Sequence, residues 1–345
     1  MAQFANHEPN ASLPEISGES LRSARRLLQH KHRAETGFFL AEGAQAVREA
    51  LRSPGAVDTL VVDDPARHQE LVDLALDDGQ LIDVVQGSSA DLASLSDTKT
   101  PQGIIAVCHW SGSRFEDIAE PRLVVICAQV RDPGNAGTVV RCADAFGADA
   151  VVLTHGSVDI TNPKTVRASV GSIFHLPIIS GVELTGAIEW AHASGLQVLA
   201  ADGSGQPVDL MAGAGQLGQP TAWLMGNEAW GLPRHDLELA DRVAAVPMWG
   251  AAESLNLSTA AAICLYATAS AQRRAPEQQP NPEGSPLMAI VVNVVIIVLM
   301  LASVVCAGIF LLLGRRARLR GRGDPRGTGA GQRDPAHPDQ ASPHD

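Results

Sequence analysis

Three short segments in the second half of the chain combine glycines with amide, carboxylate and guanidinium side chains, each directly after a predicted strand. They are 130–141 (VRDPGNAGTVVR), 224–233 (LMGNEAWGLP) and 246–258 (VPMWGAAESLNLS). In an open α/β sheet, ligands bind at the carboxyl ends of the strands. The sequence therefore predicts that these three segments meet in one ligand pocket.

Each segment contains a residue with a candidate chemical role and an ordinary structural alternative. Asn135 follows a Pro-Gly turn and Asn256 precedes the last helix, so each amide either acts in the site or only caps a helix. Arg141 either meets a ligand or pairs with Asp144, one turn along the same helix. Glu228 stands between two glycines and either points into the site or is a solvated turn carboxylate.

The elements around these segments alternate between apolar strands and helices. The strands are predicted at 122–129, 148–153, 197–201, 221–225 and 242–246, and the helices at 135–146, 165–174, 184–193, 233–239 and 257–273. Alternation of this kind predicts an α/β domain with a mainly parallel sheet and helices on both faces.

The first hundred residues predict a second, smaller α/β domain. A helix with a basic face begins near Ser17, another helix covers 42–51, and apolar strands are predicted at 38–40, 59–62, 81–85 and 103–109. A polar, turn-like segment at 112–121 separates the two domains. The predicted limits are 1–15 for a disordered N-terminus, 16–111 for the small domain and 122–273 for the larger one.

Together, the three segments resemble the motifs of the SpoU/TrmH family, the RNA ribose 2′-O-methyltransferases of the SPOUT class. The resemblance rests on the asparagine-to-arginine spacing of DPGNAGTVVR, on the GNEAWGL loop and on PMWGAAESLNLSTAAAICLYA. It covers 123–271. The segment KHRAETGFFLAEGAQAVREAL is also similar to the start of the substrate-binding domain of many members, which extends the resemblance to Ile16.

The resemblance implies a fold, a cofactor, a partner and a set of site residues. The fold is a trefoil-knotted, mainly parallel sheet, and two subunits pair as a homodimer so that the site draws on both. Ribosomal RNA is favoured over transfer RNA as the substrate because of the two-domain form. The implied contacts to S-adenosylmethionine are Gly226, Val246 and Leu255, and the implied catalytic set is Asn135, Arg141, Glu228 and Asn256.

The expected reaction moves a methyl group from S-adenosylmethionine to a ribose 2′-hydroxyl, and positioning should supply much of the acceleration. An arginine stays protonated at any relevant pH, so Arg141 is a poor candidate for the base. We predict that Arg141 grips the adjoining phosphate through two hydrogen bonds and stabilises the developing oxyanion. Glu228 or a water molecule then receives the proton.

The charge distribution argues both for and against RNA as a partner. A formal net charge of −12 disfavours binding by bulk electrostatics. The first helix nevertheless concentrates positive charge, and screening confines the effect of each charge to about 10 Å. The predicted RNA contacts, with a merely solvated helix face as the alternative, are Arg22, Arg25, Arg26, Lys31 and Arg33.

The end of the chain departs from the family pattern. Residues 274–286 are a predicted linker, 287–313 form an apolar run predicted as a transmembrane helix, and 314–345 are a predicted disordered tail. The arginines after 313 favour a cytoplasmic C-terminus, which would place the enzyme across the membrane from RNA and cofactor. Either the folded domain sets the orientation, or 288–345 is a separate membrane protein joined by fusion or by a gene-model error.

The sequence therefore predicts an RNA methyltransferase with a cytoplasmic catalytic domain, anchored to a membrane if the tail is genuine. The alternatives are a non-catalytic RNA-binding or ribosome-associated module with the same fold, and a membrane-tethered scaffold. Nucleotide-binding GxGxxG and GxxxxGK[ST] motifs and a GxSxG elbow are absent from the sequence. The five cysteines form no CxxC pair, so we expect neither a metal site nor a disulfide.

Overall fold

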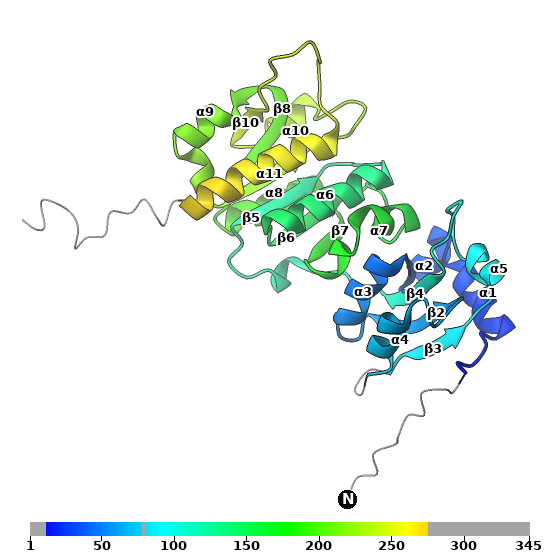
Figure 1. Cartoon of the computed structure of the whole chain (residues 1–345). Coiled ribbons are helices and arrows are strands. Elements are labelled where there is room, and N and C mark those ends of the chain that lie inside the picture. The colour runs from blue at the N-terminus through cyan, green and yellow to red at the C-terminus, as the bar shows by residue number, and fades with distance from the viewer. Residues whose placement is uncertain (1–11, 78–80, 275–345) are drawn as a thin grey trace, which may run out of the picture. The chain divides into compact units, whose positions relative to one another are not determined.

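The computed structural model describes residues 12–77 and 81–274, which belong to one compact unit, Met1–Gln278. Two β-sheets form its framework (Figure 1). The larger sheet lies within the region predicted as a methyltransferase domain, and the smaller one within the N-terminal region.

The larger sheet has six strands, and every pair of neighbours in it is parallel. In the order β10-β8-β9-β5-β6-β7, the strands are Arg242–Ala245, Gln197–Pro207, Thr221–Met225, Leu123–Cys127, Ala150–Thr154 and Ile178–Val182. This confirms the mainly parallel α/β sheet. The trefoil knot does not follow from strand order alone and stays a prediction.

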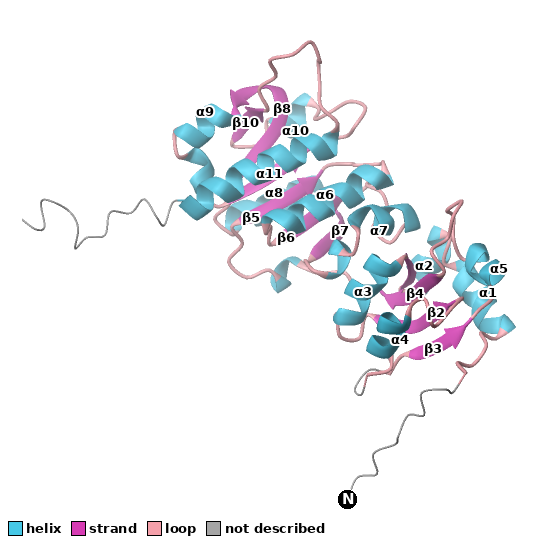
Figure 2. Ribbon diagram, viewed as in Figure 1, coloured by secondary structure: helices cyan, strands magenta, loops and turns pink. Residues whose placement is uncertain are grey.

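Helices cover both faces of this sheet (Figure 2). Alternate residues of β5 explain this, because Val125 and Cys127 pack into one buried cluster while Val124 and Ile126 pack into another. The first cluster contains residues of α6, α7, α9 and α11, and the second contains residues of α8 and α10. These helices are α6 (Pro133–Phe146), α7 (Pro163–Ser169), α8 (Leu184–Ala193), α9 (Val208–Gly213), α10 (Arg234–Leu237) and α11 (Leu257–Arg274).

The smaller sheet is mixed, with the order β1-β4-β2-β3. Its strands are β1 (Phe38–Glu42), β2 (Val57–Val62), β3 (Asp83–Gln86) and β4 (Ile104–His109). The helices α1 (Gly18–Arg26) and α5 (Ser89–Ser94) pack on one face, while α3 (Ala44–Arg52) and α4 (Gln69–Ala75) pack on the other. A further helix, α2 (His30–Thr36), continues the basic segment after a break at Leu27–Gln29.

Two ion pairs connect residues of the N-terminal region with residues around the larger sheet. The guanidinium of Arg33 donates to Asp159 Oδ2 at 2.6 Å from Nη2 and 3.0 Å from Nε, and to the carbonyl of Leu27. Burial opposes ionisation of Asp159, but hydrogen bonds from Thr161 and Arg33 hold the pKa of its carboxyl below the ordinary value. Arg167 on α7 likewise pairs with Glu42 of β1 at 3.3 Å. Arg33 and Glu42 of the N-terminal region are therefore both paired with residues around the larger sheet.

His175 forms a third contact of this kind and predicts a pH dependence. Its ring lies 2.8 Å from Asp144 Oδ2 and 3.4 Å from Glu49 Oε2. Partial burial lowers the pKa of His175, but the two carboxylates outweigh it and leave the pKa raised. A raised folded-state pKa means that the stabilisation is complete below the unfolded value of about 6.5 and is lost as the pH rises through the folded value.

We therefore expect the wild-type protein to lose stability between pH 6 and pH 8 relative to a His175→Gln variant, by about 1 kcal/mol or less because the ring is partly exposed. Urea unfolding at several pH values measures this difference. A constant difference between the two proteins across that range would contradict the assignment. The matched control is His155→Gln, which removes an exposed histidine that forms no ion pair within residues 12–77 and 81–274.

The predicted fold class is wrong in its transmembrane helix. Within residues 12–77 and 81–274, no helix is both long and apolar enough to cross a bilayer. The longest helix there, α11, has 18 residues but ends in Arg273 and Arg274. The segment 287–313 lies outside the described residues, as do the predicted linker and tail. The described residues form an α/β fold whose larger sheet is parallel throughout.

Candidate active site

The three predicted motif segments follow neighbouring strands of the larger sheet. Segment 130–141 follows β5, segment 224–233 spans the end of β9, and segment 246–258 follows β10. The strands β5 and β9 are hydrogen-bonded to each other, and β8 lies between β9 and β10. Because all of these strands are parallel, the segments meet at one edge of the sheet.

Glu228 fastens the second segment to the first. Its Oε2 accepts the backbone N–H of Arg131 at 3.2 Å, and its Oε1 accepts that of Asp132 at 3.0 Å. The side-chain amide of Asn135 donates to the same Oε1 at 3.3 Å. Charge-assisted hydrogen bonds of this kind are stronger than neutral ones, so Glu228 holds the turn before α6 in place.

A chain of side-chain hydrogen bonds extends this contact to the third segment. Asn256 Nδ2 donates to Asn135 Oδ1 at 2.9 Å, and Asn256 Oδ1 accepts from the backbone N–H of Ser258 at 2.9 Å. Asn256 therefore both caps α11 and contacts the site, as its two alternatives allowed. Three of the four predicted catalytic residues, Asn135, Glu228 and Asn256, are thus directly connected.

The capping alternative for Asn135 is wrong, because Asp132 is the N-cap of α6. Asp132 Oδ1 accepts the backbone N–H of Asn135 at 2.8 Å, and Lys164 lies 3.3 Å from its other oxygen. The hydrogen bond from Asn135 is the largest cause that holds the pKa of Asp132 below its ordinary value, and Lys164 contributes to it. Asp132 was not predicted as a cap, although an aspartate before Pro-Gly is a usual helix start.

A pocket of about 340 Å³ opens beside these contacts. Its size lies within the range of small-molecule sites, about 300–1,000 Å³. All three residues predicted to bind the cofactor, Gly226, Val246 and Leu255, line it, and so does Glu228. Asn135, Arg141 and Asn256 are not among its lining residues.

The lining suits a positively charged, partly apolar ligand. Met225, Val246 and Leu257 supply apolar surface, while Asp202 and Glu253 add two carboxylates to that of Glu228. Carboxylates in a cleft favour a cationic group such as a sulfonium. Neither Asp202 nor Glu253 was predicted as a site residue, although Asp202 directly follows the predicted strand 197–201 and could have been found by that position.

Two glycines of the motifs are required for backbone packing. A Cβ at Gly226 would collide with the backbone of Gly231, where the loop turns back on itself. A Cβ at Gly137 would collide with the carbonyl oxygen of Thr165 and with Ala168, where α6 crosses α7. Both glycines therefore make room for neighbouring parts of this chain.

Arg141 stands apart from the connected residues. It is exposed on α6, and no hydrogen bond or ion pair joins it to another residue within 12–77 or 81–274. The alternative of a pair with Asp144 is wrong, because that carboxylate binds His175 instead. Arg141 is therefore available to a ligand, but it forms no hydrogen bond or ion pair with Asn135, Glu228 or Asn256 of the described chain.

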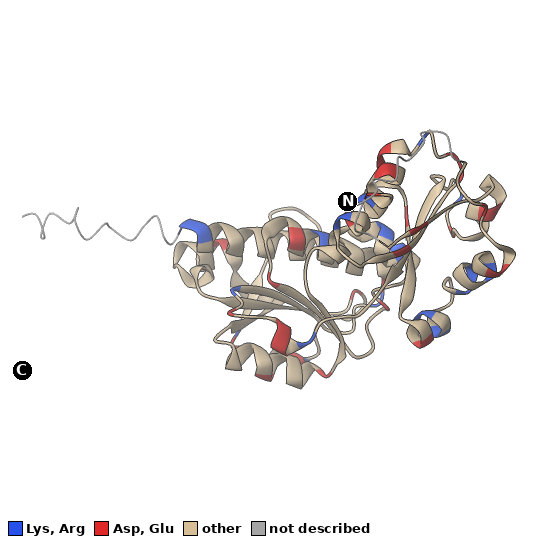
Figure 3. Ribbon diagram, turned by 90° about the horizontal axis from the view of Figure 1, so that it is seen from below, with Lys and Arg blue, Asp and Glu red and all other residues tan. Residues whose placement is uncertain are grey.

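The predicted RNA contacts divide into exposed and buried residues. Arg22, Arg25 and Arg26 are exposed on α1, as is Lys31 on α2, and Figure 3 colours such positions blue. Arg33 is only 5% exposed and is bound to Asp159, so its predicted contact with RNA is wrong. The break between α1 and α2 explains the difference, because it turns Arg33 inward instead of along the basic face.

Two protein families match this chain. The SpoU rRNA Methylase family matches residues 122–266, and the MRM3-like substrate binding domain matches residues 19–106. The first match includes all three motif segments, and the second includes α1, α2 and most of the smaller sheet.

The chain is similar over most of its length to proteins named as 23S rRNA methyltransferases. It is 37% identical over 249 residues to the 23S rRNA (guanosine(2553)-2′-O)-methyltransferase RlmP of Bacillus subtilis (strain 168), which covers 72% of this chain and 95% of that protein. It is 31% identical to the 23S rRNA (uridine(2479)-2′-O)-methyltransferase of Streptomyces viridochromogenes, covering 68% and 83% of the two chains.

Solved structures with the cofactor also share this fold. The AdoMet-bound rRNA methyltransferase from Sinorhizobium meliloti is similar with a TM-score of 0.64 and 31% identity, covering 75% of this chain and 97% of that one. The SpoU methyltransferase AviRb from Streptomyces viridochromogenes in complex with AdoMet is similar with a TM-score of 0.64 and 26% identity, covering 75% and 98%.

Proposed function

The chain belongs to the SpoU rRNA methylase family, and from that premise we propose that it methylates a ribose 2′-hydroxyl of 23S ribosomal RNA. The reaction is that of an S-adenosylmethionine-dependent RNA ribose 2′-O-methyltransferase. The observation that supports the proposal most directly is the hydrogen-bonded chain Asn256–Asn135–Glu228 beside a carboxylate-lined pocket. The names of the relatives support 23S rRNA as the target.

The pocket residues have binding and positioning roles in this proposal. Gly226, Val246 and Leu255 would hold S-adenosylmethionine, which supplies a methyl group activated by its sulfonium charge. Asp202 and Glu253 would favour that charge. The connected residues fix the three segments relative to one another, so that the ribose hydroxyl is held in line with the methyl group.

Arg141 and Glu228 take different parts in the proposed transfer. Arg141 is free of partners in the described chain and would bind the adjoining phosphate through two N–H groups while stabilising the developing oxyanion. Glu228 already accepts three N–H donors. That geometry favours a positioning role, so a water molecule becomes the better candidate to receive the hydroxyl proton.

A second copy of this chain is the proposed partner at an apolar surface next to the pocket. Met248, Trp249 and Leu255 are exposed in the third segment, and Ile263 and Tyr266 are exposed on α11, with Trp249 88% accessible. An exposed apolar patch of this kind marks an interaction site. Val246, Met248 and Leu255 line both this surface and the cofactor pocket, so a second copy docked here would border the site.

The homodimer would also complete the site. α6 packs along α11 (Figure 1). Arg141 therefore lies on a helix next to the one that carries the exposed Ile263 and Tyr266. Among the described residues, Arg141 forms no hydrogen bond or ion pair with the other site residues. Pairing through α11 would let the partner subunit's Arg141 reach the pocket of the first subunit. This arrangement agrees with the prediction that each active site contains residues of both subunits.

We assign residues 16–111 to RNA binding and 122–273 to catalysis, and the basic face of α1 to phosphate contact. Replacing Arg22, Arg25 and Arg26 together with glutamine should weaken RNA binding. The logarithm of the association constant falls linearly with the logarithm of the salt concentration, and this slope should become less steep by about two to three, one unit for each lost phosphate contact. Filter binding of 23S rRNA fragments at several salt concentrations measures that slope.

The matched control for this change removes the same charge elsewhere. Arg52, Arg114 and Arg234 are also exposed, and their triple glutamine variant should keep the wild-type salt slope. If both triple variants shift the slope equally, the basic face of α1 is no more than part of the general surface charge.

The proposed function is tested by following the methyl group. The purified chain is incubated with labelled S-adenosylmethionine and 23S rRNA that lacks the modification, and nucleosides are separated by mass spectrometry. The expected product is one 2′-O-methylated nucleoside. Binding of rRNA without any cofactor binding or product would support the non-catalytic module instead.

A further inference from the structure

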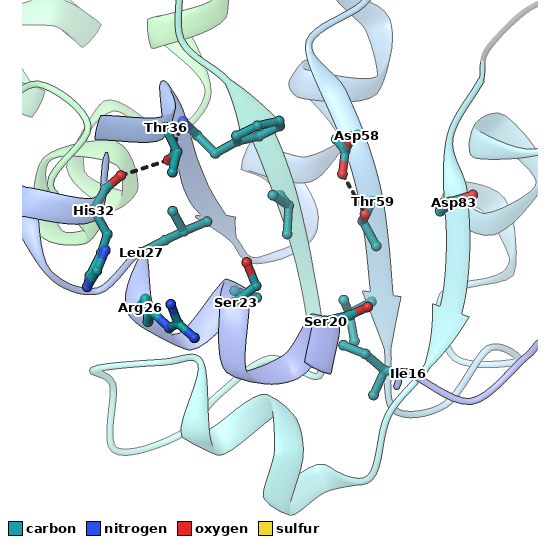
Figure 4. Close-up of a pocket in the computed structure, with 14 residues that line it drawn as sticks. Ile16, Ser20, Ser23, Arg26, Leu27, His32, Thr36, Asp58, Thr59 and Asp83 are labelled. Atoms are coloured by element: carbon teal, nitrogen blue, oxygen red, sulfur yellow. Dashed lines mark hydrogen bonds between the residues drawn. The ribbon is translucent and has the colours of Figure 1, made fainter. Parts of the chain in front are cut away.

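A second pocket, of about 390 Å³, lies on the smaller sheet, apart from the methyl-transfer site. One wall comes from α1 and α2, and the other comes from β2 and β3 (Figure 4). Ala24, Leu27 and Val61 are buried and form an apolar floor. The polar side chains that line the rest of the pocket are those of Ser20, Ser23, Arg26, His32, Thr36, Asp58, Thr59 and Asp83.

A β-bulge brings two consecutive residues of β2 into this pocket. Val57 pairs with Cys108 and Thr59 pairs with Val107, so Asp58 is an extra residue without a partner in β4. In a regular strand, neighbouring side chains point to opposite faces; a bulge redirects them and is common next to functional sites. Asp58 and Thr59 both line the pocket, and Thr59 Oγ1 donates to Asp58 Oδ2 at 2.7 Å.

The rest of the lining matches the parts of a nucleotide. Phe38 offers an aromatic surface, on which a base of any type can stack, and it is supported by the ring of His109 at 4.1 Å between centroids. Asp83 pairs with Thr59 across the sheet, so two carboxylates and a hydroxyl stand together at one rim. Arg26 lines the pocket and continues the basic face of α1 with Arg22.

We propose that this pocket binds one unstacked base of a single-stranded segment of the substrate RNA. The inference rests on the proposed function for its choice of RNA as the ligand. The base would stack on Phe38 above the apolar floor, and Arg26 would contact its phosphate. Asp58 and Asp83 accept hydrogen bonds, so they select a base with an amino group, such as guanine or cytosine, over uracil.

The test fills the pocket and measures binding to short, labelled single-stranded RNA oligonucleotides by fluorescence anisotropy with the full-length protein. Ser23→Phe and Ser20→Phe each place an aromatic ring in the pocket from an exposed position of α1. Each should weaken binding about tenfold, the usual effect of losing one stacked base. Ala34→Phe adds the same ring at an exposed position of α2 outside the pocket and should bind like the wild type.

A second comparison tests the selection of the base. The wild type should bind cytosine-rich oligonucleotides more tightly than uracil-rich ones, and Asp83→Asn should narrow that difference. Circular dichroism spectra and unfolding temperatures equal to those of the wild type would show that all variants are folded. If Ser23→Phe, Ala34→Phe and the wild type bound the oligonucleotides with equal affinity, the proposal would be overturned. It would also be overturned if Ser23→Phe and Ala34→Phe lost the same amount of affinity.

These outcomes are separate from those of the proposed function, because the binding assays involve no methyl transfer. If the chain binds RNA through this pocket but forms no 2′-O-methylated nucleoside, the proposed function fails and the base pocket stands. If methylation proceeds while Ser23→Phe binds RNA normally, the proposed function stands and the base pocket fails.

Discussion

Arg141→Ala is expected to lower kcat for RNA methylation by about 10²- to 10³-fold, the usual effect of removing one donor to a developing oxyanion. The affinity for S-adenosylmethionine should not change, since Arg141 does not line the cofactor pocket. Arg141→Lys keeps the charge but loses the paired N–H groups, so it should recover only part of the rate. Single-turnover kinetics with saturating cofactor measures both variants.

The matched control for Arg141 is another exposed arginine that lies outside the motifs. Arg114→Ala removes the same charge and should leave kcat at the wild-type value. An Arg141→Lys enzyme with near-normal kcat would contradict the proposed bidentate hydrogen bonding to the phosphate, because a lysine cannot present a planar pair of donors.

A mixed dimer of two inactive variants is expected to regain roughly half of the wild-type activity per subunit, because one of its two sites is complete. The first is Arg141→Ala, with an intact pocket. The second is Gly203→Trp. Gly203 lines the pocket and a Cβ at this position would meet no other atom within 4 Å, so the indole ring can occupy the pocket without a collision at the backbone. If Arg141 acts across the dimer, a mixed dimer has one complete site, formed by the first subunit's pocket and the second subunit's arginine.

The result of this mixing separates two arrangements of the site. If Arg141 serves the pocket of its own chain, no mixed dimer contains a complete site and the mixture stays inactive. Co-expression with two different affinity tags isolates the mixed dimers for the assay. Adding Ile263→Asp and Tyr266→Asp to both chains should abolish the recovery, because it places carboxylates in the proposed apolar interface.

The buried strands were the most predictable part of the fold. β5, β6 and β9 are buried along their whole lengths, so their sequences are continuous apolar runs. The edge strand β7 was missed because Ser180 and Gly181 are exposed and interrupt its pattern. The predicted helix 165–174 was too long because Val170 adopts a left-handed conformation, with φ of 52°, and ends α7.

The site was predictable where the contacts are local to the strand ends. The motifs identified Glu228, Asn135 and Asn256, and parallel strands bring their segments together. The inward turn of Arg33 was not predictable, because its partner Asp159 lies 126 residues further along the chain. Nothing near Arg33 in the sequence distinguishes it from the exposed arginines of α1.

The buried Arg33–Asp159 pair also limits how the enzyme can be redesigned. Because we propose that residues 16–111 bind the RNA, exchanging them for those of a relative would test whether they choose the methylated nucleotide. Residues 16–111 contain Arg33 but not Asp159, so a replacement without an arginine at this position would leave the partly buried carboxylate of Asp159 without its ion pair and destabilise the chimera. Modules can therefore be swapped productively only between parents that share both residues, or with both transplanted together.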